Sequence, residues 1–148
     1  MDKQEPTKYF VFVSHSSRDT WVAKQIAREI TQSGAMPFLD EAQIDIGADF
    51  EEDIRNFLQQ ADELVVLLTP WALERPYIWA EIGVAWGRGI PIVALLHGMT
   101  SEELQSKPSV PLFLKKRNLL DLNEVDIYFE QLRQRIATDF SGSYGVSP

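Results

Sequence analysis

The feature that most constrains this chain is an alternation of short apolar runs with longer helical segments. Four runs have the length and the β-branched or aromatic content of buried strands, and a weaker run follows them: 9–13, 35–39, 64–68, 90–96 and 118–122. The segments between them carry apolar residues at helical spacing. Because parallel strands need crossovers of this kind, the pattern predicts an α/β fold with a five-stranded parallel sheet.

For this sheet we expect the flavodoxin-like strand order 2-1-3-4-5, with helices on both faces. Helices are expected to open at Asp19, to begin near Ala48, and to cover 76–88, 101–107 and 125–140. Helical spacing assigns an inward position to the following residues of the first and last helices: Trp21, Val22, Ile26, Ile30, Ile127, Phe129, Leu132 and Ile136.

The chain has 148 residues, 45% of them hydrophobic, which suits one domain with one core. We place this domain at residues 8–140, after an N-terminal extension at 1–7 and before a flexible tail at 141–148. No apolar run approaches the length of about 18 residues that a membrane span requires. We therefore expect a cytoplasmic protein that does not bind membranes.

Charge and composition exclude several classes of function. Lys and Arg number 14 against 22 Asp and Glu, a formal net charge of -8 that repels nucleic acid. The chain has no cysteine and two histidines far apart, so disulfides, thiolate nucleophiles and a metal site are not expected. No bound cofactor is predicted.

In a doubly wound parallel sheet, ligands bind beyond the carboxyl ends of the strands. This rule directs attention to residues 14–19, 40–47 and 69–81. Within the third segment, Glu81 is the only charge between Arg75 and Arg88, and its helical neighbours are aromatic or aliphatic. An unpaired buried carboxylate would be costly, which favours a ligand or a polar partner beside it. A purely structural interpretation has about equal weight. In it, the carboxylate of Glu81 reaches solvent at the rim of the site or hydrogen-bonds a neighbouring loop.

Other residues of these segments have both a binding and a structural interpretation. Backbone N–H groups and Arg18 can hold phosphate or ribose after the first strand, where the small polar side chains are Ser14, His15, Ser16 and Ser17. No Ser-His-Asp pattern supports His15 as a catalytic base. Tyr77 can stack on a ring or pack in the core, and core packing is the favoured interpretation for Trp71 and for Trp79.

Taken together, these segments resemble a Toll/interleukin-1 receptor (TIR) domain over residues 8–136. Residues 9–19 match the first sequence box of that family, and residues 38–40 with 45–47 resemble the second. Residues 69–81 resemble the Trp-Xaa-Xaa-Xaa-Glu motif of catalytic members, with Tyr77 in place of the tryptophan and Glu81 at the catalytic glutamate. The Phe-Trp third box of animal receptors is absent, which favours the bacterial branch.

The resemblance implies that Glu81 splits NAD+ at its nicotinamide bond, by hydrolysis or by cyclisation, in bacterial antiphage immunity. It adds the second-box residues Asp45 and Gly47 to the substrate-binding set, which otherwise comprises Ser14, His15, Ser16, Arg18, Trp71 and Tyr77. NAD+ would be the substrate and not a resident cofactor. Members of the family self-associate, so that one subunit's second-box loop completes its neighbour's site, and a separate sensor or signal-responding protein is a further expected partner.

Two alternatives remain open. Residues 81–85 and 89–93 also resemble nucleoside 2-deoxyribosyltransferases, in which Glu81 would be a covalent nucleophile. Many TIR domains, in addition, are adaptors that only bind other TIR domains. Glu81→Ala would leave the interactions of an adaptor intact, whereas a transferase would exchange bases on deoxynucleosides.

Overall fold

The parallel sheet expected from the sequence is present, with the expected strand order. The computed structural model describes residues 8–39, 56–110, 114 and 119–143. Its sheet has the order β2-β1-β3-β4-β5, and every neighbouring pair of strands is parallel. The strands are β1 Phe10–Ser14, β2 Met36–Leu39, β3 Glu63–Leu68, β4 Ile92–Leu96 and β5 Leu120–Asp121.

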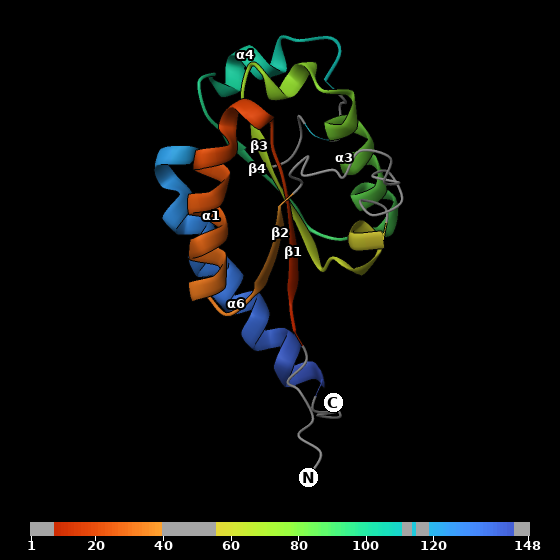
Figure 1. Cartoon of the computed structure of the whole chain (residues 1–148), viewed down its shortest axis with the longest axis vertical. Helices are drawn as coiled ribbons and strands as arrows, with labels where there is room; N and C mark the ends of the chain where they lie inside the picture. The colour runs from red at the N-terminus through yellow and green to blue at the C-terminus, as the bar shows by residue number, and fades with distance from the viewer. Residues whose placement is uncertain (1–7, 40–55, 111–113, 115–118, 144–148) are drawn as a thin grey trace.

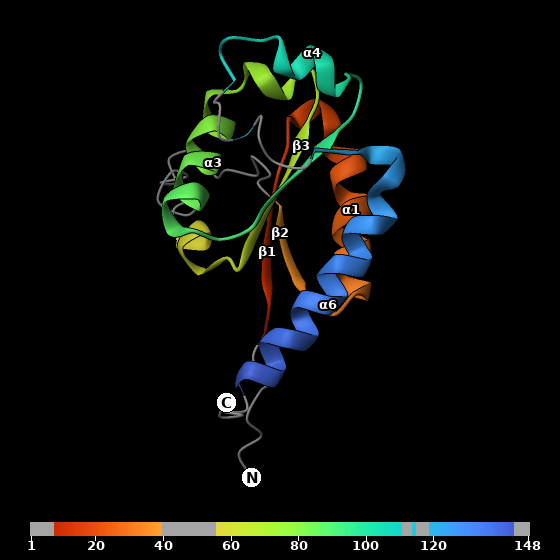
Figure 2. The same ribbon diagram turned by 180° about the vertical axis from the view of Figure 1, so that it is seen from behind.

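Helices cover both faces of this sheet. Two of them, α1 and α6, lie on one face, and α3 lies on the other (Figure 1, Figure 2). The α-helices are α1 Thr20–Gln32, α3 Pro76–Arg88, α4 Ser101–Gln105 and α6 Val125–Ser143. Residues 56–60 are also helical, and three short 3-10 helices are η1 Ser17–Asp19, η2 Ala72–Glu74 and η3 Leu122–Glu124. No helix in the described part of the chain is long and apolar enough to cross a membrane.

The central strand β3 supplies both halves of the core. All its residues are buried, and its side chains alternate between the two faces of the sheet. Leu64 and Val66 belong to the apolar cluster that includes α3, whereas Val65 and Leu67 belong to the cluster that includes α1 and α6. Burying one such side chain stabilises the fold by about 1.5–3 kcal/mol. The two-sided burial explains why this run is apolar without alternation.

The inward positions expected for Trp21 and Ile127 are wrong. Trp21 is 72% exposed and Ile127 is 49% exposed, whereas Ile30 and Ile136 are buried as expected. Each exposed residue precedes a buried isoleucine of its own helix by nine positions, which is two and a half turns at about 3.6 residues per turn. The two residues of each pair therefore point in opposite directions, and Tyr128 takes the inward position next to Ile127.

Two of the expected boundaries, the start of the fourth strand and the end of the last helix, differ from the structure. The fourth strand begins at Ile92 and not at residue 90, because the N–H of Ile90 donates to the carbonyl of Ala85 at 3.3 Å. This bond closes the end of α3, where Gly89 has a left-handed φ of 73°. Helix α6 continues to Ser143, so that the first residues of the expected tail are helical. The extension at 1–7, the helix start near Ala48 and the last tail residues lie outside the described residues.

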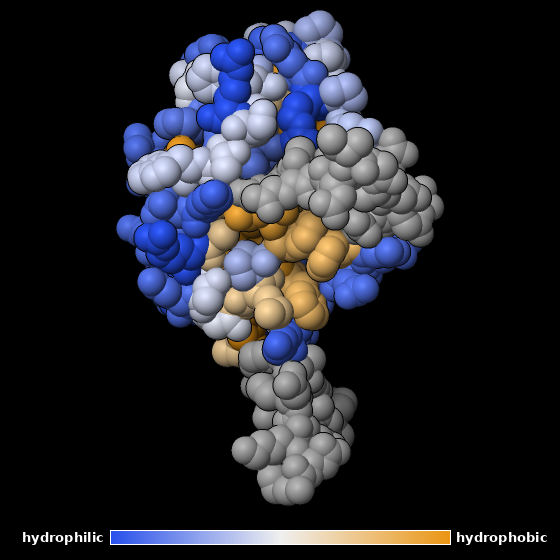
Figure 3. Space-filling view, viewed as in Figure 1, coloured by the Kyte–Doolittle hydropathy of each residue, from blue (hydrophilic) through white to orange (hydrophobic). Residues whose placement is uncertain are grey.

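Strand β2 forms an outer edge of the described sheet, and its sequence restricts pairing there. The N–H of Met36 donates to the carbonyl of Tyr9 at 2.8 Å, so the backbone of Met36 faces β1. Adjacent residues turn their backbone groups to opposite sides, and Pro37, which has no N–H, therefore faces outward. Figure 3 shows apolar side chains gathered near the middle of the face seen in Figure 1. Phe38 of β2 stacks on Phe57, which is 41% exposed.

A buried glutamate ties α6 to the amino-terminal end of the sheet. Glu63 begins β3, is fully buried, and accepts hydrogen bonds from Tyr9 at 2.7 Å and Tyr128 at 2.5 Å. Arg135 of α6 donates from Nε to Oε1 at 2.8 Å and from Nη2 to Oε2 at 3.1 Å. An interior carboxylate is tolerated when it is paired in this way. Burial, and after it the charge of Glu63, raises the pKa of both tyrosines.

Candidate active site

Buried polar side chains gather at the carboxyl end of the sheet. Among the described residues that are buried and polar or charged, Glu63 lies at the amino end, and the others are Ser14, His15, Ser16, Asp19, Thr69 and Glu81. They come from the end of β1, the start of α1, the end of β3 and the interior of α3. A fold buries polar groups only where they have partners or a function. This edge is therefore the candidate site.

Glu81 occupies a core position of α3. The buried residues of this helix include Ile78, Ile82 and Ala85, which share one helical face with Glu81. Only 1% of Glu81 is exposed, which contradicts the interpretation that it reaches solvent at the rim. Its carboxylate instead has a hydrogen-bond partner, which is the last residue of strand β1 and not a residue of a neighbouring loop.

Ser14 is that partner. It is the last residue of β1 and is fully buried, and its Oγ donates to Oε1 of Glu81 at 2.5 Å. Side chains alternate along a strand, so Ser14 lies on the same face as Phe12, which packs in the cluster of α3. A hydrogen bond to a charged acceptor is short and strong, and it fixes the carboxylate in one orientation.

His15 and Ser16 direct their side chains to the backbone. His15 is 1% exposed, and its Nδ1 lies 2.8 Å from the carbonyl oxygen of Ser16. Since a carbonyl oxygen only accepts, Nδ1 carries the proton and Nε2 has the lone pair when the ring is neutral. Ser16 Oγ accepts from the N–H of Arg18 at 3.2 Å and caps η1. Both residues shape the loop after β1, and His15 also accepts, through its carbonyl, from the Arg75 guanidinium.

Arg18 and Trp71 form an exposed pair at this edge. The guanidinium carbon of Arg18 lies 5.8 Å from the centre of the Trp71 ring, within the range of a cation–π interaction. Trp71 is 43% exposed, so the favoured core position is wrong for this residue. Core packing is confirmed for Trp79, which is partly buried against the core cluster. Its Nε1 donates to the carbonyl of Leu73 at 3.3 Å.

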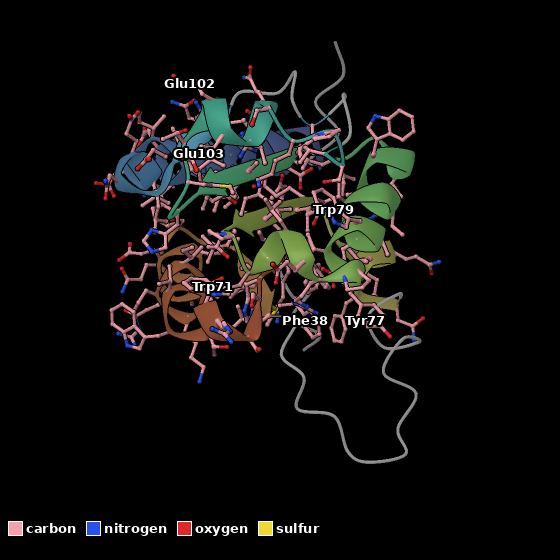
Figure 4. The ribbon with its side chains drawn as sticks, turned by 90° about the horizontal axis from the view of Figure 1, so that it is seen from above. Phe38, Trp71, Tyr77, Trp79, Glu102 and Glu103 are labelled. Carbon is pink, nitrogen blue, oxygen red and sulfur yellow. The ribbon has the colours of Figure 1, made fainter. Side chains whose placement is uncertain are left out.

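Tyr77 lies in the first turn of α3 and is 40% exposed. In the view of Figure 4, Trp71 lies toward α1, Tyr77 lies at the beginning of α3, and Phe38 lies between them. Asp45 and Gly47 are outside the described residues. The structure thus brings together Ser14 and Glu81, and separately Arg18 and Trp71.

Asp19 and Thr69 lie in the segments 14–19 and 69–81 that the sequence indicates, but the sequence patterns predict no role for either side chain. Thr69 is fully buried at the end of β3, and its Oγ1 donates to Oδ2 of Asp19 at 2.6 Å. The two residues are 50 positions apart. Aspartate is common at the N-cap of a helix, so the sequence alone offers a local reason for an aspartate at position 19. For that reason the sequence gives no sign of its distant partner Thr69.

Chemically, the site offers one fixed carboxylate and hydrogen-bonding groups. No group of His, Asp and Glu side chains within the described ranges is arranged to hold a metal ion. The carboxylate of Glu81 can stabilise a cationic transition state or attack an electrophilic carbon. The fold and this carboxylate define a flavodoxin-like α/β domain with its candidate site at the switch region of the sheet.

Comparison with known proteins identifies the family. The family model described as TIR domain matches residues 11–136, and the chain therefore belongs to the TIR domain family. A search of curated protein sequences finds no significant match.

Solved structures with the same fold include the TIR domain of the Toll-related receptor TRR-2 from Hydra magnipapillata. It is 17% identical, with a TM-score of 0.63 over 88% of this chain and 97% of that chain. A 2-desoxiribosyltransferase from Leishmania mexicana is 10% identical, with a TM-score of 0.64 over 85% and 97%. A metazoan TIR-STING receptor from C. gigas is 15% identical, with a TM-score of 0.62, and this chain covers 42% of it. At these identities the likeness concerns the fold.

Proposed function

We propose that this TIR domain is an NAD+ nucleosidase that cleaves the bond between nicotinamide and ribose with Glu81. The observation that carries the proposal is the burial of Glu81, at 1% exposure, with a 2.5 Å hydrogen bond from Ser14. The fold would tolerate a neutral or apolar residue at this core position more cheaply than a carboxylate. A carboxyl group buried at a cost, and fixed in orientation, is typical of a group with a chemical role.

The reaction makes small demands on the protein. Nicotinamide leaves as a neutral pyridine, so no general acid has to protonate it, and the paired carboxylates of ordinary glycosidases are not required. Glu81 would orient the ribose hydroxyls and stabilise the positive charge that develops at the anomeric carbon. Water or a group of the substrate itself then captures the cation, giving ADP-ribose or a cyclic isomer.

We assign the other residues roles that follow from their contacts and exposure. The hydroxyl of Ser14 acts on Glu81, and the side chains of His15 and Ser16 act on the backbone of their own loop. Their contribution to substrate binding is therefore the shape of the loop. The exposed side chains that we propose as direct substrate contacts are Arg18, Trp71 and Tyr77. Asp45 and Gly47 remain proposed contacts.

We further propose that the protein acts in the cytoplasm as an effector or signal generator in bacterial antiphage immunity. Self-association would bring the loop that contains Asp45 and Gly47 of one copy to the site of another. Exposed large hydrophobic side chains, among them Trp21 and Trp86, offer surface for such contacts. A separate sensor or signal-responding protein would be the other partner, and the formal charge of -8 argues against nucleic acid.

A transferase acting on deoxynucleosides is the second candidate. It is favoured by the shared fold of the 2-desoxiribosyltransferase, at a TM-score of 0.64, and by a carboxylate that can serve as nucleophile. In that reaction the Glu81 carboxylate would attack the anomeric carbon and displace the first base, and a second base would then displace Glu81 from that carbon. An adaptor that only binds other TIR domains would use neither chemistry.

The test is an analysis of products by chromatography and mass. Wild type is incubated with NAD+, and separately with a deoxynucleoside and a second free base. Glu81→Gln removes the charge, and Glu74→Gln, at an exposed position of η2, is the matched control. We expect nicotinamide release by wild type and Glu74→Gln and its loss in Glu81→Gln. Base exchange without nicotinamide release would establish the transferase, and the absence of both reactions in the concentrated protein would favour the adaptor.

A further inference from the structure

Two loops at the carboxyl edge of the sheet are joined by three contacts. One loop follows β1 and leads into α1, and the other follows β3 and leads into α3. Thr69 bonds Asp19 in the interior, Arg18 lies over the Trp71 ring at the surface, and the guanidinium of Arg75 donates to a carbonyl of the first loop. The proposed function uses Arg18 and Trp71 as substrate contacts, and it gives no role to the bond between Asp19 and Thr69.

The carboxylate of Asp19 does not cap the helix α1 that follows it. Asp19 is the N-cap residue of α1, and an aspartate there usually accepts a hydrogen bond from the first turn. In this structure its side chain makes no cap bond and accepts instead from Thr69, at 2.6 Å. Asp19 is 5% exposed and Thr69 is fully buried, so this is an interior bond to a carboxylate.

Thr69 connects the carboxylate of Asp19 to the turn that contains Trp71. Its Oγ1 also accepts from the N–H of Ala72 at 3.1 Å, and its carbonyl oxygen accepts from the N–H of Leu73 at 3.2 Å. These two bonds span Trp71, whose carbonyl accepts from Glu74 at 3.2 Å. The position of the indole beneath Arg18 therefore depends on the hydroxyl of Thr69 and, through it, on the carboxylate of Asp19.

The pair of an indole and a guanidinium has a defined recognition chemistry. An aromatic face stacks on a nucleobase, and a guanidinium donates to phosphate oxygens. The two groups lie together, with Trp71 43% exposed and Arg18 exposed as well. A ligand that presents a base and a phosphate at adjacent positions, such as an adenosine phosphate, would satisfy both.

We propose that Asp19 is a positioning residue, which acts through Thr69 to hold Trp71 beneath Arg18 as a binding platform for the adenosine phosphate end of the substrate. The proposal rests on the proposed function for the identity of the substrate. It assigns the platform to binding and Glu81 to bond cleavage. Loss of the bond between Asp19 and Thr69 should accordingly weaken substrate binding and leave the chemical step nearly unchanged.

The experiment measures AMP binding by calorimetry together with KM and kcat for NAD+. Thr69→Val and Asp19→Ala remove the donor and the acceptor of the bond, whereas Thr69→Ser and Asp19→Asn retain them. We expect the Kd for AMP and the KM to rise roughly tenfold in the first two variants, the size of one lost stacking contact. Thr69→Ser and Asp19→Asn should stay within about threefold of wild type. Glu29→Gln, an exposed change on α1, is the control.

A merely structural role predicts a different result. It would lower the melting temperature of Thr69→Val while the folded protein bound AMP as wild type does, and that result would overturn the proposal. Failure of wild type to bind AMP would overturn it as well. If Asp19→Ala does not fold, the comparison of Thr69→Val with Thr69→Ser decides. If wild type binds AMP through this platform but cleaves no NAD+, the proposed reaction fails and the platform stands.

Discussion

Replacement of Glu63 by glutamine tests whether the buried cluster at the amino end of the sheet holds α6 in place. The change keeps the size of the side chain but removes its charge. Glu63 accepts four hydrogen bonds, from the hydroxyls of Tyr9 and Tyr128 and twice from Arg135. A glutamine retains one oxygen, and its amide nitrogen would face groups that also donate.

The size of the effect follows from burial. Removing one partner of a buried ion pair typically costs about 3–5 kcal/mol, because the remaining charge loses its counterpart. The Arg135 side chain is 30% exposed, so its guanidinium can recover part of its hydration. This places the loss for Glu63→Gln near the lower end, at about 3 kcal/mol. Tyr128→Phe, which removes one bond to the carboxylate, should cost about 1.5 kcal/mol.

Urea denaturation followed by circular dichroism gives the free energy of unfolding. Glu29→Gln is the matched control, and at that exposed position the change should stay within about 0.5 kcal/mol. The double variant Glu63→Gln/Arg135→Gln should lose less than the sum of the two single losses, because the two side chains share their contacts. A loss below about 1 kcal/mol in Glu63→Gln would refute the reasoning.

Three further predictions concern the site, the pH dependence and the helix faces. Ser14→Ala should lower kcat about tenfold, the equivalent of one charge-assisted hydrogen bond, and unchanged steady-state kinetics would contradict this. The pKa of the Tyr9 and Tyr128 hydroxyls is raised in the folded protein. As the pH rises above their ordinary pKa of 10.0, these hydroxyls therefore ionise first in the unfolded chain. Stability is therefore complete below that pH and falls above it, by about 1.4 kcal/mol per pH unit for each tyrosine, and denaturation series should show a shallower fall in Tyr9→Phe. Trp21→Gln should change stability by less than about 0.5 kcal/mol, whereas Ile30→Ala should cost about 2–5 kcal/mol, and equal losses in thermal unfolding would show that Trp21 is not on the outer face.

The sheet is the part of the fold that local sequence predicts well. A strand buried on both faces needs an unbroken apolar run, so β1 and β3 can be recognised without tertiary information. The faces of the helices are harder to predict. Trp21 and Ile127 lie half a turn out of phase with Ile30 and Ile136, but hydrophobicity alone does not show which residue of each pair meets the sheet.

In the candidate site, too, local sequence predicts some features and not others. The apolar surroundings of Glu81 can be inferred from helical spacing, but whether its carboxylate is buried or reaches the rim cannot, and the structure shows it buried. Its hydrogen bond from Ser14 joins residues 67 positions apart, and the bond between Thr69 and Asp19 joins residues 50 positions apart. Such partners depend on strand register, which a single sequence does not display.

The most direct test of the central claim is the rate of nicotinamide release per molecule of protein, measured for wild type and Glu81→Gln over a series of protein concentrations. Both proteins are first shown to be folded by circular dichroism. We expect turnover by wild type to rise with concentration as copies associate, and a loss of about a hundredfold to a thousandfold in Glu81→Gln. Equal rates in the two proteins would contradict the assignment of Glu81 as the catalytic group.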